Sequence, residues 1–154
     1  MKVLEFLKSK GVACEVSEHK PAFTAQRMAA IEHEPGKYVA KPVLVKADGE
    51  MIMCVLDANH KIDMAKLKGQ LGAKKAVIAE ETEVGNACKD CELGAEAPIG
   101  SLYGITTVMD KAVEKADHIV FAAGSHDKAV RISMADFLKL AEPKVLDFSY
   151  HMSL

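Results

Sequence analysis

Two apolar runs flanking Asp48-Gly49 constrain the fold of this chain more than any other feature. Residues 38–46 and 50–56 are rich in apolar and β-branched residues, which favours extended strands. An Asp-Gly pair readily adopts the positive φ angles that a tight hairpin turn requires. The sequence therefore predicts an antiparallel hairpin, around which the rest of a sheet forms.

Lys41 is an unusual residue in the first arm of this hairpin. Alternation along a strand places it on the same face as the valines at positions 39, 43 and 45. An ammonium on a covered apolar face loses hydration, so it persists only with a bound partner or a lowered pKa. The lysine either points into a ligand pocket or lies on an edge strand with its head in water. Pro42 supports the edge strand, because proline is confined to strand edges, strand starts and bulges.

Helices and short strands alternate along the rest of the chain. Thr24, Asp63 and Ser133 are favourable N-caps for helices that run to about residues 31, 71 and 140. A further helix is predicted at 1–10 and a short one near residue 80, and strands are predicted at 12–16, 76–79, 105–109, 118–122 and 129–132. This order indicates an α/β (α+β) fold with a mixed sheet in a single compact domain.

Composition narrows the classes of function. The chain has 154 residues, a formal net charge of −2 and only two arginines, Arg27 and Arg131. So few arginines argue against a surface built for bidentate recognition of phosphate or guanine, and DNA is not an expected partner. There is no secretory signal and no apolar run near about 18 residues, so we expect a cytoplasmic protein without a membrane segment.

Charge is segregated along the middle of the chain. Residues 61–75 contain five lysines against Asp63, and residues 80–96 contain six acidic residues against Lys89. Either these segments form two solvated surfaces, or the lysines attract a polyanion toward a neighbouring pocket.

Cys88 and Cys91 form a Cys-x-x-Cys pair that could hold half of a zinc site. No second pair of that kind and no paired histidines complete it, so no metal and no cofactor is expected. Carboxylates surround the pair and should raise the thiol pKa, unlike the electropositive setting of a thioredoxin-like motif. The sequence favours incidental thiols.

Two glycine-containing turns are candidates for a ligand site. His126 follows Gly124-Ser125 after an apolar strand, where it either reaches a ligand or is simply solvated. Gly94 and Pro98 delimit a loop in which glycine allows close backbone approach and proline adds stiffness. Such a loop offers N–H and C=O groups to a substrate without using side chains. No Ser-His-Asp order, P-loop or dinucleotide fingerprint is present.

Together, these pieces resemble a known family when read in order. They are Glu18-His19-Lys20-Pro21-Ala22-Phe23-Thr24-Ala25-Gln26, Val39-Ala40-Lys41-Pro42-Val43-Leu44-Val45 with the hairpin, Leu71-Gly72-Ala73, Cys91-Glu92-Leu93-Gly94-Ala95-Glu96-Ala97-Pro98-Ile99-Gly100, Ile119-Val120-Phe121-Ala122-Ala123-Gly124-Ser125-His126 and Asp136-Phe137. The ordered set resembles the YbaK/prolyl-tRNA-synthetase-associated domain family of free-standing aminoacyl-tRNA deacylases. The likeness covers about residues 1–140.

The resemblance implies a partly barrel-like mixed sheet surrounded by helices over residues 1–141, and residues 142–154 are expected to be a loosely attached tail. It implies that Lys41 holds the acylated 3′ end of the tRNA, with Gly94 and His126 beside it in catalysis. The residues expected to bind substrate are Thr24, Ala95, Pro98, Gly100, Gly124 and Ser125. Many members carry threonine or asparagine after the lysine, whereas Pro42 offers no side-chain hydrogen bond.

The implied activity is trans-editing, the hydrolysis of the ester of a mischarged aminoacyl-tRNA that carries a small amino acid. The expected partners are the acceptor 3′ end of the tRNA and an aminoacyl-tRNA synthetase. An alternative uses the same pocket in a non-catalytic module that binds tRNA or a nucleotide.

Overall fold

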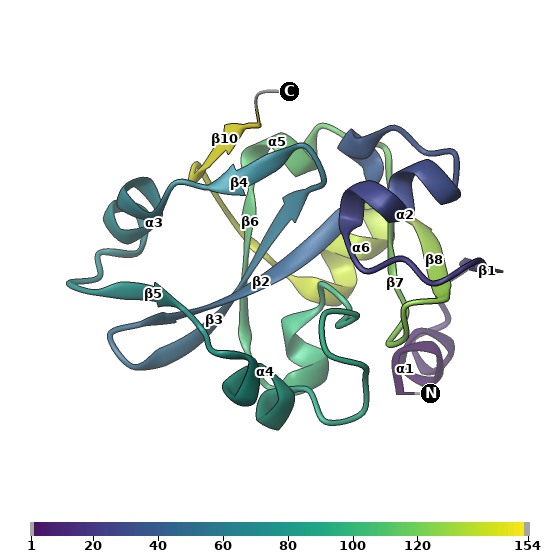
Figure 1. The fold of residues 1–154 in the computed structure, drawn as a ribbon, viewed down its shortest axis with the longest axis horizontal. Coiled ribbons are helices and arrows are strands. Elements are labelled where there is room, and N and C mark those ends of the chain that lie inside the picture. The colour runs from purple at the N-terminus through teal and green to yellow at the C-terminus, as the bar shows by residue number, and fades with distance from the viewer. Residues whose placement is uncertain (1, 153–154) are drawn as a thin grey trace.

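The computed structural model describes residues 2–152 and shows a mixed five-stranded sheet packed with helices (Figure 1). The strand order is β5-β2-β3-β6-β9. Their bounds are Ala76–Ile78 for β5, Ala40–Ala47 for β2, Glu50–Asp57 for β3, Thr106–Asp110 for β6 and Lys144–Leu146 for β9. β6 is parallel to both of its neighbours, and β2 is antiparallel to both of its own. The predicted fold class is confirmed.

Two smaller sheets complete the strands of the described chain. One has the order β1-β8-β7, and the other pairs β10 with β4. Their bounds are Glu15–Glu18 for β1, Lys128–Ser133 for β8, His118–Ala122 for β7, Ser149–His151 for β10 and His60–Ile62 for β4. A single parallel bridge between Val39 and Val120 links the two larger sheets. The strands therefore approach one another without closing into a barrel.

Helices cover the sheets and are capped as the sequence predicts. Their bounds are Lys2–Ser9 for α1, Ala25–Ile31 for α2, Met64–Leu71 for α3, Glu81–Ala87 for α4, Lys111–Glu114 for α5 and Met134–Ala141 for α6, with 3₁₀ turns η1 at Gly36–Tyr38 and η2 at Gly100–Tyr103. Thr24, Asp63 and Ser133 each accept a hydrogen bond from a backbone N–H three residues later. Within residues 2–152, no helix combines the length and apolar character needed to cross a membrane.

The predicted hairpin is confirmed and forms the centre of the fold. Asp48 and Gly49 have φ angles of 50° and 84°, and Ala47 pairs with Glu50 across the turn. The second arm, β3, is buried on both faces. Met53 packs into one core cluster and Cys54 into another, which explains the nearly continuous apolar sequence of this strand.

Pro42 lies where β2 has a free edge. β2 pairs with β3 along its whole length, but it pairs with β5 only over residues 45–47. Proline has no N–H to donate to a neighbouring strand, so this local edge accepts it without loss of a ladder hydrogen bond. The edge of β2 around Pro42 is therefore open for other parts of the chain to approach.

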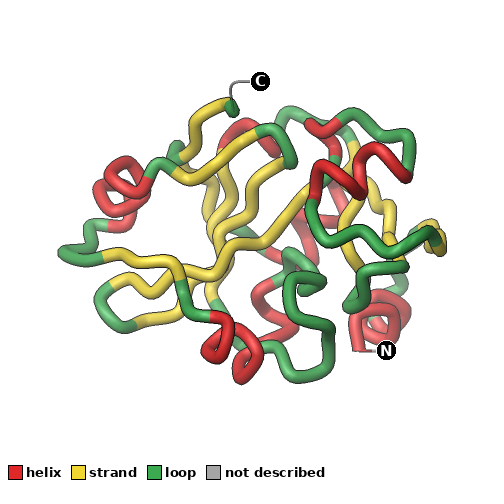
Figure 2. The backbone as a smooth tube through the Cα atoms, viewed as in Figure 1, coloured by secondary structure: helices red, strands yellow, loops and turns green. Residues whose placement is uncertain are grey.

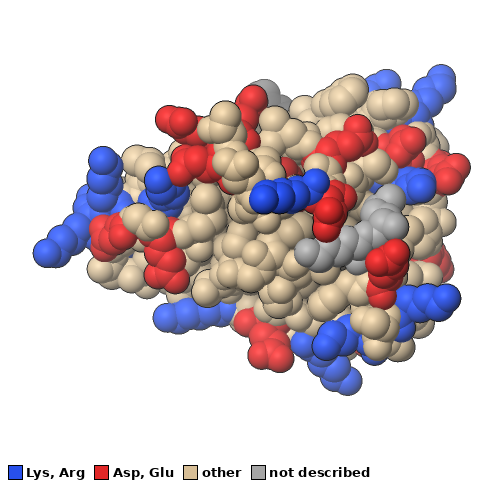
Figure 3. All heavy atoms as spheres, turned by 90° about the horizontal axis from the view of Figure 1, so that it is seen from below, with Lys and Arg blue, Asp and Glu red and all other residues tan. Residues whose placement is uncertain are grey.

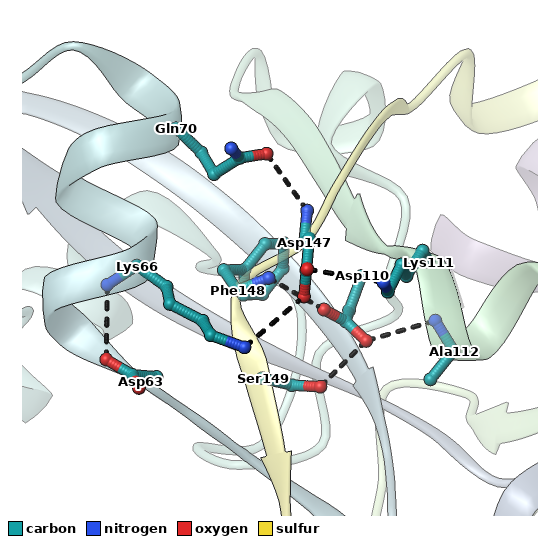
Figure 4. Close-up of polar contacts among 9 residues, drawn as sticks. All are labelled: Asp63, Lys66, Gln70, Asp110, Lys111, Ala112, Asp147, Phe148 and Ser149. Carbon is teal, nitrogen blue, oxygen red and sulfur yellow. Dashed lines mark hydrogen bonds and ion pairs between the residues drawn. The ribbon is translucent and has the colours of Figure 1, made fainter.

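Residues 144–151 differ from the loosely attached tail that the sequence predicts. They form β9 at the edge of the main sheet and β10 beside β4, and Phe148 between them is fully buried. The buried carboxylate of Asp110 accepts hydrogen bonds from the Phe148 N–H at 2.9 Å and the Ser149 hydroxyl at 2.7 Å (Figure 4). β9 and β10 have three residues each and lack the continuous apolar run that indicates β5, so the sequence pattern misses them.

The C-terminal strands should contribute strongly to stability through Phe148. Replacing it with alanine should cost roughly 3–5 kcal/mol in the free energy of unfolding, because the change opens a cavity in the core. Urea denaturation would measure this loss. Tyr150→Ala is the matched control, since Tyr150 is 50% exposed on the neighbouring strand. A loss at Phe148 no larger than at Tyr150 would contradict firm attachment of this segment.

Candidate active site

A small cavity of about 40 Å³ lies where the free edge of β2 meets α2, the loop after α4 and the turn after β7. Four residues predicted for the site line it: Thr24, Lys41, Gly94 and His126. The other lining residues are Ala22, Phe23, Ala25, Met28, Ala40, Pro42, Glu96 and Ala122. Segments from four regions of the sequence thus meet at one concave site. Larger hollows occur elsewhere on the described surface, but they do not contain these residues.

Small side chains behind the cavity explain why a hollow remains there. The core cluster at this position is formed by Val39, Val120 and Met28 together with alanines at positions 22, 29, 58, 95, 122 and 129. An alanine fills little volume, so closely packed elements still leave space between them. The space suits a small apolar group rather than a large one.

Lys41 is half-buried at the rim of this cavity. Burial lowers the pKa of its ammonium below the ordinary value of 10.5, Asp57 acts in the opposite direction, and Lys61 lowers it further. Among the described residues, none forms an ion pair with Lys41. A partly desolvated cation without an ion-pair partner is ready to bind an anion.

The turn at residues 124–127 holds the walls of the cavity together. Its Gly124 accepts a hydrogen bond from the Glu92 N–H at 2.8 Å and donates one to the Ala95 carbonyl at 3.0 Å. The backbone carbonyl of His126 accepts a hydrogen bond from the Ala22 N–H at 2.9 Å. The loop after α4 and the segment before α2 are therefore both fixed to one turn. In Figure 2 that loop is the long irregular segment between α4 and η2.

The imidazole of His126 connects the same two segments. Its Nε2 lies 2.8 Å from the Leu93 carbonyl oxygen, and its Nδ1 lies 3.2 Å from the Ala22 carbonyl oxygen. Both partners are acceptors, so a neutral ring can satisfy one of them and an imidazolium can satisfy both. Because both ring nitrogens contact main-chain oxygens, the imidazole links the segment before α2 to the loop after α4.

Gly94 lies between His126 and Glu96, in a conformation that favours glycine. Its φ is +88°, and a Cβ added there would lie 3.4 Å from Cε1 of His126. The Gly94 N–H donates to Oε1 of Glu96 at 3.0 Å. The positive φ that glycine allows is therefore found at Gly94, where the backbone lies close to the His126 ring.

The remaining predicted substrate-binding residues lie outside the cavity lining. Ala95 and Gly124 are buried just behind it, where they hydrogen-bond to each other. The Ser125 hydroxyl donates to Asp127 at 2.7 Å. Pro98 is buried, and the Gly100 N–H donates to the Thr107 hydroxyl at 2.8 Å. A Cβ on Gly100 would overlap the Ile105 carbonyl oxygen, so this glycine is needed for packing.

Two residues of the site were not found from the sequence. Phe23 is 73% exposed, and its ring centroid lies 4.6 Å from that of His126. Glu96 is only 6% exposed, although its linear neighbourhood is acidic and suggests a solvated surface. An exposed aromatic residue gives no periodic signal, and charge counting does not report burial.

The lysines of residues 61–75 lie at separate places in the structure and do not form one continuous surface. Lys61 is close enough to Lys41 to influence its pKa, whereas Lys66 pairs with Asp147 at 3.7 Å. Lys74 and Lys75 lie at the turn of the hairpin, where their backbone N–H groups donate hydrogen bonds to the Asp48 carboxylate. On the face drawn in Figure 3, cationic and anionic side chains are interspersed. A single-sign surface is not seen on that face.

Cys88 and Cys91 are thiols and are not joined by a disulfide. The pKa of Cys91 is lowered because a hydrogen bond from the Cys88 side chain outweighs burial and the charges of Glu96 and Asp90. The surrounding carboxylates Glu96 and Asp90 do act to raise this pKa, as expected, but they do not decide its net direction. Among residues 2–152, no group of three histidine, cysteine or acidic side chains is arranged to hold a metal ion.

Comparison with solved structures supports the fold. The chain superimposes on the crystal structure of the hypothetical protein APE2540 with a TM-score of 0.87 at 19% identity, covering 97% of this chain and 100% of the other.

Comparison of sequences identifies the family. The chain is 26% identical over 152 residues to the multifunctional Ser/Thr-tRNA deacylase ProXp-y of Escherichia coli K12, covering 96% of this chain and 90% of that one. It is 30% identical over 100 residues to proline–tRNA ligase of Streptococcus pneumoniae serotype 4, covering 65% of this chain and 16% of the ligase. The family model of the aminoacyl-tRNA editing domain matches residues 19–140. This protein therefore belongs to the aminoacyl-tRNA editing domain family.

Proposed function

We propose that this protein is a trans-editing hydrolase that cleaves the ester of a mischarged aminoacyl-tRNA carrying a small amino acid. The observation that carries this proposal is Lys41, a partly desolvated cation without an ion-pair partner, in the lining of a small cavity with an alanine-rich wall. Family membership and the likeness to a tRNA deacylase support the same reaction. A cytoplasmic location follows from the proposed substrate.

The charged 3′ end of a tRNA fits the two parts of this site. The ammonium of Lys41 binds the phosphodiester next to the terminal adenosine, and the esterified amino acid enters the cavity. Phe23 offers an exposed aromatic face beside the opening, on which the terminal base can stack. The alanine-rich wall accepts small side chains, and one methylene changes binding by only about 1–3 kcal/mol. We therefore expect several small amino acids to be accepted.

The reaction itself uses positioned water rather than a covalent nucleophile. Water adds to the ester carbonyl carbon, the bond to the ribose oxygen breaks, and that oxygen leaves with a proton. Backbone groups of the Gly94–Pro98 loop orient the water. The N–H groups of Gly94, Ala95 and Ala97 already donate to Glu96, Glu92 and Tyr103, so the Glu96 N–H is the donor of this loop left to stabilise the negative charge that develops on the carbonyl oxygen. The vicinal ribose hydroxyl of the substrate assists. His126 positions this loop, since its ring nitrogens contact the Leu93 and Ala22 carbonyls.

Lys41 should be required for efficient deacylation. Lys41→Ala should lower kcat/KM by about 10- to 100-fold, because a hydrogen bond to a charged group is lost. Lys41→Arg keeps the charge and should retain more activity. A panel of mischarged tRNAs measures the rates for wild type and both variants.

Three outcomes of that panel bear on the proposal. Equal rates for wild type and Lys41→Ala would remove Lys41 from the mechanism. Absence of hydrolysis with every tRNA would remove the enzyme function. Tight retention of tRNA on a filter with its ester intact would favour the alternative, a non-catalytic binding module.

Gly94 should be required for the shape of the loop. Gly94→Ala should destabilise the protein by about 1–2 kcal/mol and reduce deacylation, because alanine disfavours the observed positive φ. Gly85→Ala is the matched control: Gly85 lies within α4 with open space around its Cβ position. This control should stabilise by roughly 0.5–1 kcal/mol. Urea denaturation compares the two, and a stabilising Gly94→Ala would contradict the constrained loop.

A lysine-lined hollow beside the cavity provides a place for the tRNA beyond its terminal nucleotide. It has a volume of about 360 Å³ and includes Lys37, Tyr38, His60 and Lys115. Asp57 also lines it and interacts electrostatically with Lys41, so hollow and cavity are neighbours. Phosphates of the acceptor strand would bind here through lysine.

Reversing two charges in this hollow should weaken tRNA binding. Lys37→Glu with Lys115→Glu should lower affinity roughly tenfold, because two phosphate contacts are lost. The slope of log affinity against log salt should fall by about one for each contact. Lys8→Glu with Lys10→Glu is the control, since both lysines are exposed near the end of α1. Filter binding at several salt concentrations measures both, and equal losses would contradict a specific role for the hollow.

A further inference from the structure

Glu96 is a buried carboxylate in the wall of the candidate active site. It is 6% exposed and lines the same cavity as Lys41. The other acidic side chains of residues 80–96 are partly or fully exposed to solvent. Burial of a carboxylate is costly unless hydrogen bonds or an opposite charge compensate it, so its presence at this position needs an explanation.

Only part of that compensation comes from the protein. Oε1 of Glu96 accepts a hydrogen bond from the Gly94 N–H at 3.0 Å, which ties the carboxylate to the loop. Within the described chain, no lysine, arginine or histidine forms an ion pair with Glu96. The cavity thus holds one anion and one cation, Glu96 and Lys41, that are not paired with each other.

An aminoacyl ester at a tRNA 3′ end carries the complementary pair of charges. Its α-ammonium lies one carbon from the ester carbonyl, and its phosphodiester lies on the far side of the ribose. We propose that the carboxylate of Glu96 binds the α-ammonium of the esterified amino acid, an inference that rests on the proposed function. Lys41 takes the phosphodiester, so the two charges orient the ester between them.

This arrangement gives the site a specificity beyond side-chain size. A substrate whose α-nitrogen is acylated has no positive charge there, and it carries extra bulk into a cavity of about 40 Å³. Esters with a free α-amino group are hydrolysed, and N-acylated or peptidyl esters are rejected. Glu96 is therefore a specificity-determining residue of the proposed reaction.

The test compares two acyl groups that differ at the α-position. Alanyl-tRNA carries the ammonium, and lactyl-tRNA carries a hydroxyl in its place. Glu96→Gln keeps an oxygen for the Gly94 N–H but removes the negative charge. It should lower kcat/KM for alanyl-tRNA by about 10- to 100-fold and leave lactyl-tRNA within about twofold of wild type. Wild type should hydrolyse N-acetylalanyl-tRNA far more slowly than alanyl-tRNA.

Glu92→Gln is the matched control variant. Glu92 lies in the same loop and accepts a hydrogen bond from the His126 N–H at 2.9 Å, but it does not line the cavity. Any effect of this change should be the same for both esters. Equal losses for both esters in Glu96→Gln would show that Glu96 only supports the loop, and unchanged rates in Glu96→Gln would also overturn the proposal.

A binding experiment separates this inference from the proposed hydrolysis. Non-hydrolysable 3′-amide analogues of alanyl- and lactyl-adenosine 5′-phosphate are titrated against wild type and Glu96→Gln. A preference for the alanyl analogue that is lost in the variant supports the ammonium contact even where no ester is cleaved. Equal affinity of wild type for the two analogues overturns it. Hydrolysis that proceeds in wild type with no such preference leaves the deacylase function standing and removes the role of Glu96.

Discussion

Hydrogen bonding by the turn at residues 124–127 is the interaction on which the candidate active site depends. The turn binds the loop after α4 through Gly124 and the segment before α2 through His126. Neither of these irregular segments has a sheet ladder to define its position at the cavity. Fixing both to one turn, which joins the end of β7 to the start of β8, gives the cavity walls a common support.

The surrounding fold explains why the cavity forms at this point. Around Pro42, β2 pairs with β3 but not with β5. The core cluster next to this edge consists mainly of alanine. An open strand edge lets a loop approach, and small side chains leave space beneath it. Lys41 sits at the same edge, so a half-buried cation and an apolar hollow become neighbours without any long connecting segment.

Local sequence patterns predicted most helices and strands, but they did not predict which individual polar groups are buried. The Asp48-Gly49 hairpin and the caps at Thr24, Asp63 and Ser133 are short-range features, and each is found in the structure. The meeting of Lys41, Gly94 and His126 was expected from the ordered resemblance rather than from spacing. The burial of Glu96 and the pairing of β10, which carries Ser149, with β4 depend on contacts between segments distant in the sequence. A local sequence pattern does not report such contacts.

The position of Pro42 also bears on how the molecule behaves at high concentration. An unpaired strand edge ordinarily invites a strand from a second molecule, which is a common route to aggregation. A ring nitrogen without hydrogen interrupts the row of donors along this edge, so an intermolecular ladder cannot continue across it. The same proline that lines the cavity therefore leaves this short edge of β2 without a continuous row of donors for another copy of the chain.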